Sequence, residues 1–112
     1  MTEIYKILTK TAWNEAQKEG LFQGSKDDLR DGFIHFSSKE QLQGTLEKHF
    51  KGQKDLILLA IKETDLGENL KWEPSRGGAL FPHLYAPLPT SHVLWEKPLE
   101  VLNDGSHIIP KL

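Results

Sequence analysis

Three short stretches of the chain set ionisable side chains between apolar or glycine residues. They are residues 32–38 (GFIHFSS), 72–78 (WEPSRGG) and 81–85 (FPHLY). Settings of this kind hold polar side chains at strand ends instead of leaving them fully solvated. Binding and catalytic groups are often presented in this way by a rigid scaffold. The three stretches therefore predict a small active site or binding site.

His35 lies between Ile34 and Phe36 in a segment typical of a strand. Because side chains alternate along a strand, His35 faces opposite its two neighbours, and so faces a cleft or solvent if they enter the core. An imidazole there suits general acid–base catalysis or binding of a sugar hydroxyl group. The alternative is a hydrogen-bonded structural histidine. Ser37 shares the face of His35, and its alternative role is to cap the next helix.

Glu73 follows an indole, Trp72, and precedes Pro74, so its backbone is expected to be extended. Partial desolvation beside the indole would raise the pKa of Glu73 and suit it to proton transfer or to stabilising a cation. The alternative is an exposed glutamate paired with Arg76. Arg76 and the two glycines after it could bind a phosphate, although the spacing is not that of a Walker A loop.

His83 and Tyr85 share one face of the third stretch, with Leu84 on the other. Tyr85 could stack on a base or a nicotinamide ring, or donate its hydroxyl group. The alternative is a tyrosine packed on the sheet, with its hydroxyl bonded to a backbone carbonyl.

The sequence lacks the motifs of several other catalytic classes. There is no cysteine, and the five histidines do not form an HExxH or HxH pattern, so no metal site is predicted. There is also no GxSxG nucleophile elbow and no GxGxxG dinucleotide fingerprint.

Composition limits the remaining possibilities. A chain of 112 residues is expected to form a single domain, residues 1–112. With 14 basic and 16 acidic residues its net charge is −2, which disfavours an extended nucleic-acid surface but allows a small nucleotide. The N-terminus has no hydrophobic signal core, and the longest apolar run, residues 56–61, is too short to cross a membrane. We therefore expect a cytoplasmic protein without a membrane partner; the sequence does not indicate its oligomeric state.

Periodicity and turn residues predict strands and helices in an α+β order. The later strands lack helical crossovers, so antiparallel pairing is expected. Residues 55–62 should form a central strand, and residues 81–90 an irregular segment or an edge because of their prolines. The other expected strands are residues 3–8, 33–36, 69–73, 92–102 (broken near Pro98) and 108–112. Helices are expected from Thr9 or Thr11 to Gly20, as a short turn with a capping-box-like start at residues 25–28 (SKDD), and from Ser38 towards Gly52.

With these residues in view, the chain resembles the domain of unknown function 952 family, which is uncharacterised and mostly bacterial. The resemblance spans nearly the whole chain. It is carried by residues 4–7 (IYKI) with Trp13, 31–37 (DGFIHFS), 55–59 (DLILL), 72–73 (WE) and 81–85 (FPHLY).

The strand containing His35 and Ser37 is also similar, more remotely, to the opening of the ADP-ribosyltransferase fold, in particular its RNA 2′-phosphotransferase branch. That resemblance implies a core of two small, mainly antiparallel sheets with two or three helices and a cleft between the sheets. It implies that His35 and Ser37 hold a ribose or a phosphate, and that Glu73 is the late acidic residue. Such enzymes usually carry a histidine or arginine on the first strand, where this chain has Lys6.

The leading prediction is an ADP-ribosyltransferase-like enzyme that acts on NAD or an ADP-ribose-type nucleotide, without a metal. Its catalytic residues would be His35, Glu73 and His83, with Glu73 stabilising the cation formed at the ribosyl C1 atom. Its ligand-binding residues would be Lys6, Ser37, Arg76 and Tyr85, with Arg76 at the pyrophosphate. One alternative is a non-catalytic module that binds a small ligand or a protein. Another is a structural network of polar side chains, with the function in a partner surface.

Overall fold

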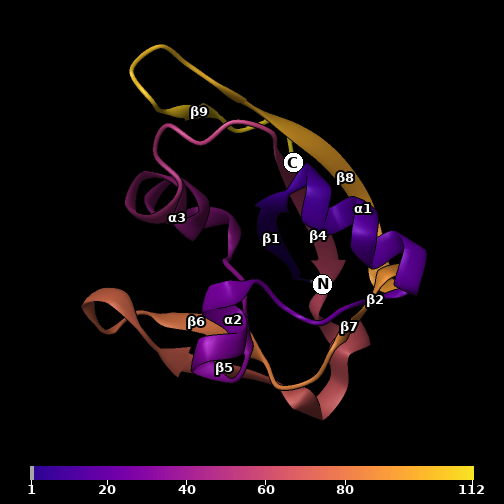
Figure 1. The fold of residues 1–112 in the computed structure, drawn as a ribbon. Helices are drawn as coiled ribbons and strands as arrows, with labels where there is room; N and C mark the ends of the chain where they lie inside the picture. Colours follow the sequence, from indigo (N-terminus) through magenta and orange to yellow (C-terminus); the bar gives the residue numbers. More distant parts are fainter. Residues whose placement is uncertain (1) are drawn as a thin grey trace.

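Strand β4 (Leu56–Lys62) is the centre of the principal sheet in the computed structural model, which describes residues 2–112 except the side chain of Arg76. Its run of apolar residues is buried on both faces, as expected for a central strand. It pairs with β1 (Glu3–Thr9) on one side and with β8 (Val93–Val101) on the other. The hairpin strand β9 (His107–Ile108) extends the sheet, giving the antiparallel order β1-β4-β8-β9 (Figure 1).

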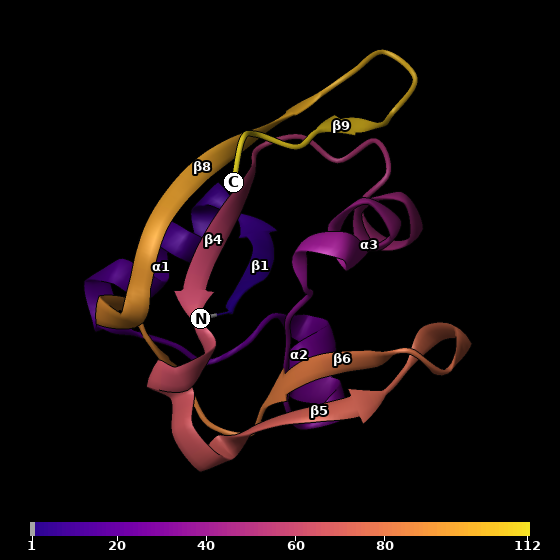
Figure 2. The same ribbon diagram turned by 180° about the vertical axis from the view of Figure 1, so that it is seen from behind.

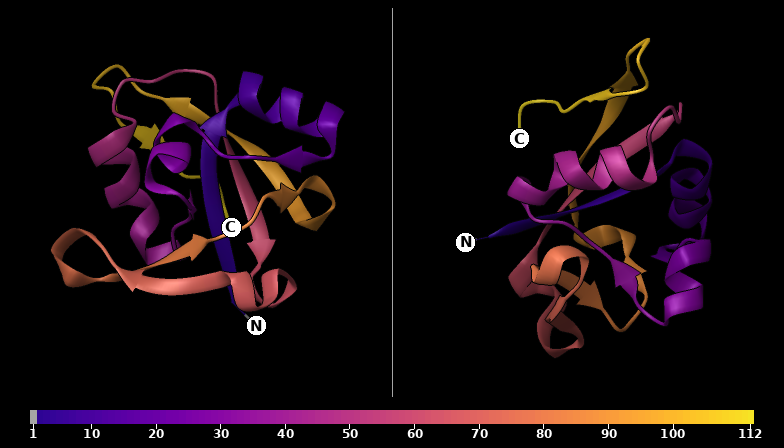
Figure 3. Two further views of the ribbon diagram at one scale, coloured as in Figure 1. Left: turned by 60° about the horizontal axis from the view of Figure 1, so that its bottom comes forward. Right: turned by 90° about the vertical axis from the view of Figure 1, so that its left-hand side faces the viewer.

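Two helices cover opposite faces of this sheet (Figure 3). Helix α1 (Lys10–Glu19) begins at Thr9, whose side chain accepts from the Ala12 amide, and ends at Gly20 in the left-handed conformation. Helix α3 (Leu42–His49) follows a 3₁₀ turn that opens with a reciprocal Ser38–Gln41 capping box. Both helix starts and the glycine that ends α1 are as predicted.

The alternation along β1 explains the two covered faces. Ile4 and Leu8 pack with the α1 side of the core, whereas Tyr5 and Ile7 pack with the α3 side. Lys6 lies on the same face of β1 as Ile4 and Leu8 and is 5% exposed. A charged side chain is therefore buried at a position where the alternation predicts an apolar one.

A second antiparallel sheet lies across one end of the first (Figure 2). It contains β3 (Ile34–His35), β6 (Leu80–Leu84) and β5 (Leu70–Pro74), in the order β3-β6-β5. Helix α2 (Lys26–Asp31) precedes β3, and its N-terminus is a capping box between Ser25 and Asp28, as the sequence pattern predicted. Within residues 2–112 the fold therefore has three α-helices, and the α+β class is confirmed.

The prediction that residues 81–90 are irregular or an edge is wrong for β6, which is the middle strand of its sheet. Pro82 is tolerated because β3 ends beside it: the last bond in this direction runs from the Phe36 amide to the Pro82 carbonyl oxygen. The amide and carbonyl of one residue face the same neighbour in an antiparallel ladder. The position where Pro82 lacks an N–H therefore faces β3, which ends at this point. The hydrogen bonds between β6 and β5 are not affected.

Two further differences concern smaller elements. Strands β2 (Leu21–Phe22) and β7 (Leu88–Pro89) pair as a third small sheet, where two sheets were expected. Strand β8 is not broken at Pro98, which pairs in register with Ile57 outside the part of β8 that β9 covers. None of the helices within residues 2–112 combines the length and the apolar character needed to cross a bilayer.

We expect Leu59→Ala to lower the free energy of unfolding by about 2–5 kcal/mol, because Leu59 is fully buried between β1 and β8 and its truncation leaves a cavity. Leu94→Ala is the control, since Leu94 is 48% exposed on β8 and its loss should cost about 0.5 kcal/mol or less. Urea denaturation followed by circular dichroism measures both. Equal losses would contradict the central position of β4.

Candidate functional site

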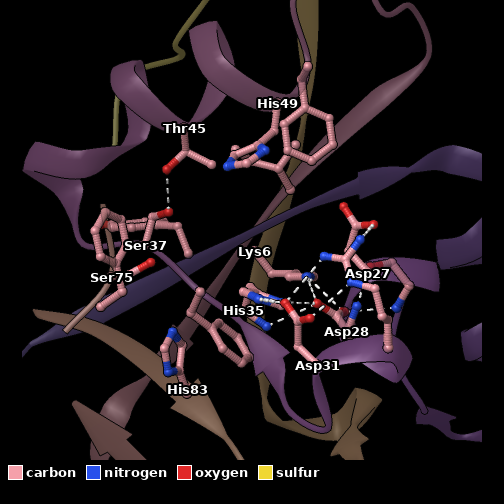
Figure 4. Close-up of a pocket in the computed structure, with 17 residues that line it drawn as sticks. Lys6, Asp27, Asp28, Asp31, His35, Ser37, Thr45, His49, Ser75 and His83 are labelled. Carbon is pink, nitrogen blue, oxygen red and sulfur yellow. Dashed lines mark hydrogen bonds and ion pairs between the residues drawn. The ribbon is translucent and has the colours of Figure 1, made fainter. Parts of the chain in front are cut away.

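A cavity of about 240 Å³ opens where the edge of β1, helices α2 and α3 and the second sheet meet (Figure 4). Its wall mixes aromatic and aliphatic groups with many polar side chains. The polar lining residues are Lys6, Ser25, Asp27, Asp28, Arg30, Asp31, His35, Ser37, Thr45, His49, Ser75 and His83. The cavity thus brings together side chains from β1, α2, β3, α3 and β6.

His35 and Ser37 face the cavity because their neighbours face the core. Ile34 and Phe36 are each 3% exposed, and alternation turns His35 and Ser37 to the opposite side, as predicted. Beyond β3 the chain leaves β6, and Ser37 exchanges two backbone hydrogen bonds with Tyr5 of β1, at 2.8 and 2.9 Å. This bridge ties the second sheet to the first beside the cavity.

The Ser37 hydroxyl does not cap a helix. Ser38 forms the capping box, whereas Ser37 Oγ lies 2.9 Å from Thr45 Oγ1 of α3. The alternative reading of Ser37 as a cap is therefore wrong, and its hydroxyl is paired with a second hydroxyl on the cavity wall.

The Asp28 carboxylate is the hub of the α2 wall. Its two oxygens accept from Lys6 Nζ at 2.9 and 3.1 Å. It also accepts from the amides of Ser25 and His35, at 2.8 and 3.1 Å, and its Oδ1 lies 2.6 Å from His35 Nδ1. Asp28 is 2% exposed, so nearly all of its hydrogen-bonding capacity is met by the protein. Lys6 lines the cavity as part of this pair, and its ammonium is held by Asp28.

Burial and pairing oppose each other in these two charges. Burial alone would raise the pKa of Asp28, but the hydrogen bond from His35 and the charge of Lys6 outweigh it and hold this pKa well below its usual range. For Lys6 the burial effect is larger than the attraction of Asp28, and its pKa is lowered. Asp28 is therefore ionised at neutral pH. Its negative charge offsets the cost of burying the Lys6 ammonium.

His35 has a carboxylate at each end of its ring. Nδ1 lies 2.6 Å from Asp28 Oδ1, and Nε2 lies 3.0 Å from Asp31 Oδ2. Asp31 also accepts from the Arg30 Nε at 3.0 Å, and hydrogen bonding to Arg30 lowers the pKa of Asp31. Both ring nitrogens of His35 are thus occupied by ionised groups in this structure.

Glu73 forms a separate cluster behind His83. Its Oε1 accepts from His83 Nδ1 at 2.9 Å and from the Tyr85 hydroxyl at 2.6 Å. These hydrogen bonds, the one from Tyr85 first, lower the pKa of Glu73, so the expectation that desolvation by Trp72 would raise it is wrong. The Trp72 indole N–H is directed instead to Glu63, at 2.6 Å.

The predicted residues therefore fall into two groups. His35, His83, Ser37 and Lys6 lie on the cavity wall, whereas Glu73 and Tyr85 are not among the described residues that line this cavity. Tyr85 bonds to Glu73 and not to a backbone carbonyl through its hydroxyl. The predicted contacts of the Arg76 side chain lie outside the described part of the chain.

The ring of Phe33 joins the two groups. Its centroid lies 4.0 Å from that of His83 in a stacked arrangement, 4.6 Å from His35 and 5.3 Å from Tyr85. Aromatic pairs of this kind contribute about 0.5–1.5 kcal/mol beyond burial. Phe33 therefore fixes the orientation of the three rings. Two of them, His35 and His83, line the cavity, whereas Tyr85 bonds to Glu73 behind it.

Sequence reasoning did not predict eight of the polar residues of the cavity wall, among them Asp28, Asp31, Thr45 and His49. Thr45 and His49 carry a signal that could have shown them, because a spacing of four residues places both on one side of α3. Asp28 was recognised only as a capping residue, and nothing local predicts its contact with Lys6. Among the described residues, no three His, Asp or Glu side chains are grouped so as to hold a metal ion.

The fold and the cavity define an α+β protein with a small, polar, histidine-containing site. The chain belongs to the family described as "Protein of unknown function (DUF952)", whose model matches residues 7–96. It is similar to the crystal structure of protein CC0527 from Caulobacter crescentus, with 53% identity and a TM-score of 0.93 over 96% of this chain and 94% of that one. The solution structure of the same protein matches with 55% identity and a TM-score of 0.85, over 95% and 91% of the two chains. No curated protein sequence gives a significant match.

We expect Asp28→Asn to destabilise the fold by about 3–5 kcal/mol, because it leaves the Lys6 ammonium buried without a counter-charge. Asp27→Asn is the matched control on the same helix: Asp27 is exposed and its pair with Arg30 should be worth about 1 kcal/mol or less. Denaturant titration measures both. Adding Lys6→Met to Asp28→Asn should recover stability, and a further loss in the double variant would contradict the charge argument.

The ion pair between Lys6 and Asp28 also predicts how the stability of the fold depends on pH. The folded-state pKa of Asp28 lies below its unfolded value of about 3.9, so its contribution is complete above that pH and is lost as the pH falls further towards the folded-state value. The wild type should therefore lose more stability than Asp28→Asn when thermal unfolding is compared at neutral pH and at about pH 3. Parallel losses in the two proteins would show that other carboxylates carry the acid sensitivity.

Proposed function

We propose that the protein is an enzyme that binds a ribose-bearing nucleotide of the NAD or ADP-ribose type and cleaves or transfers a group at its ribosyl C1 atom. The observation that carries this proposal is the composition of the cavity wall. Hydroxyl groups, imidazoles and an excess of carboxylates surround a single cavity, and apolar rings complete it.

The charge of the wall favours the nicotinamide–ribose end of such a ligand over its pyrophosphate. Among the described lining residues, three carboxylates (Asp27, Asp28 and Asp31) outnumber two cations (Lys6 and Arg30). The nicotinamide ring of NAD is positively charged, and cleavage at C1 passes through an oxocarbenium-like state. Carboxylates beside that position stabilise both.

The size of the cavity supports the same choice. Its volume of about 240 Å³ is below the range of about 300–1,000 Å³ that is usual for sites of drug-sized ligands. One sugar with part of a ring fits such a space, and the rest of a dinucleotide would lie along the rim. The Arg30 side chain is 67% exposed at that rim, where a phosphate could reach it.

The roles of individual residues follow from their positions. The paired hydroxyls of Ser37 and Thr45 are placed to bind ribose hydroxyl groups. Asp31 lines the cavity and Glu73 does not, so Asp31 is the better candidate for stabilising the cation at C1. Tyr85 supports the site from behind instead of stacking on the ligand, and the contact of Arg76 with a pyrophosphate stays a prediction.

The second candidate function is a binding module without turnover, and Lys6 is the observation that favours it. Its ammonium donates to both oxygens of Asp28, so two of its three N–H donors are already used and the first strand is poorly suited to grip a ribose. Such a module would use the same cavity and bind the same class of ligand.

We expect the amide resonances of labelled protein to shift at His35, Ser37, Thr45 and His83 when NAD or ADP-ribose is added. Release of free nicotinamide in the ligand spectrum would establish turnover. Shifts without release would favour the binding module. Unchanged spectra at millimolar ligand would contradict the proposed function.

A matched pair of serine variants locates the binding site. Ser37→Ala removes a cavity hydroxyl and should weaken binding about five- to tenfold, the effect of one lost hydrogen bond. Ser91→Ala removes an exposed hydroxyl that is not among the lining residues and should leave binding unchanged.

A further inference from the structure

His83 combines near-complete burial with an unused ring nitrogen. Its side chain is 6% exposed, and Nδ1 is engaged by Glu73. Within the part of the chain that the structure describes, Nε2 has no hydrogen-bond partner. Nε2 is not among the described atoms that are both fully buried and unpaired, so it keeps some exposure, and the ring lines the cavity. An unpaired ring nitrogen that a ligand can reach points to a role in the cavity.

The Glu73 carboxylate determines which nitrogen of His83 carries the proton. Its Oε1 accepts from His83 Nδ1 and from the Tyr85 hydroxyl, and this second bond keeps the carboxylate ionised. An ionised carboxylate only accepts, so Nδ1 must carry hydrogen. In the neutral ring, Nε2 then has a free lone pair.

The direction of that lone pair follows from the packing. The Nδ1 edge of His83 faces Glu73, which is not among the described lining residues, whereas His83 itself lines the cavity. We therefore infer that the opposite edge, with Nε2, is reached from the cavity. Phe33 stacks on the His83 ring at 4.0 Å, and β3 and β5 flank its backbone. The ring is therefore oriented before any ligand enters.

His35 lies beside it but cannot serve the same purpose. The two imidazole centroids are 5.6 Å apart, and both rings line the cavity. Yet His35 Nδ1 faces Asp28 and His35 Nε2 faces Asp31, so neither nitrogen is left to accept a proton from a ligand.

We propose that His83 is the general base of this site, that the nucleophile it activates is an O–H group of water or an alcohol, and that Glu73 and Tyr85 position it. Nε2 takes the hydroxyl proton while the oxygen bonds to the ribosyl C1 atom. The bond from C1 to the nicotinamide nitrogen breaks, and that nitrogen keeps the electron pair, so nicotinamide leaves neutral. His83 later returns the proton to solvent. The electrophile in this step rests on the proposed function, whereas the assignment of the base does not.

Long-range proton–nitrogen NMR spectra of the unliganded, labelled protein at neutral pH test the assignment of the base. We expect the neutral His83 ring to carry its proton on Nδ1 and not on Nε2. Glu73→Ala should shift His83 towards the Nε2–H tautomer, and Glu73→Gln should retain the wild-type tautomer through its amide oxygen. A protonated Nε2 in wild-type His83 would overturn the proposal.

Kinetics separate this inference from the proposed function. With NAD as substrate, His83→Gln should keep binding but lose about 100-fold or more in turnover, the usual share of a general base. Glu63→Gln is the matched control, since Glu63 also accepts from an aromatic side chain of the second sheet but does not line the cavity. Full turnover in His83→Gln would overturn the base and leave the NAD site standing. Absence of NAD binding by the wild type would overturn the proposed function, while the tautomer spectra would still decide the base.

Discussion

The ion pair between Lys6 and Asp28 is the interaction on which the geometry of the site depends. It lies between the first strand and helix α2, 22 residues apart in the chain, and both side chains are almost fully buried. The other acceptor positions of Asp28 are filled by the start of α2 and by His35 of β3. One carboxylate therefore connects the principal sheet, the helix and the second sheet at the place where the cavity forms. A buried pair of this kind adds little net stability over an apolar pair, so its contribution is mainly to hold these three elements in one arrangement.

The cavity itself results from a strand that changes partners. Residues 34–35 pair with β6, and two residues later Ser37 bridges to Tyr5 of β1. Where the chain crosses from one sheet to the other, its backbone groups are paired on both sides while its outward side chains have no sheet to cover them. His35 and Ser37 are those side chains, and α2 and α3 close the space around them (Figure 4).

Local patterns were enough to predict much of this. The Ser25–Asp28 capping box, the Thr9 cap, the central strand β4 and the outward direction of His35 all depend on neighbours within a few residues, and all are present. The contact of Asp28 with Lys6 could not be predicted, because a capping aspartate looks the same whether or not a buried ammonium lies beside it. The tolerance of Pro82 in a middle strand likewise depends on where β3 ends.

The two cavity histidines show why residue type and position alone did not determine the chemistry. Both were expected to take part in catalysis, and both line the cavity with their rings 5.6 Å apart. They differ in the number of carboxylates that contact each ring. His35 has a carboxylate at both nitrogens, whereas His83 has a carboxylate at Nδ1 alone among the described residues. The sign of the pKa shift at Glu73 has the same origin, since it is set by the hydroxyl of Tyr85, twelve residues away. The hydrogen-bonding state of each cavity histidine is therefore decided by carboxylates contributed from other elements, which the strand carrying that histidine does not encode.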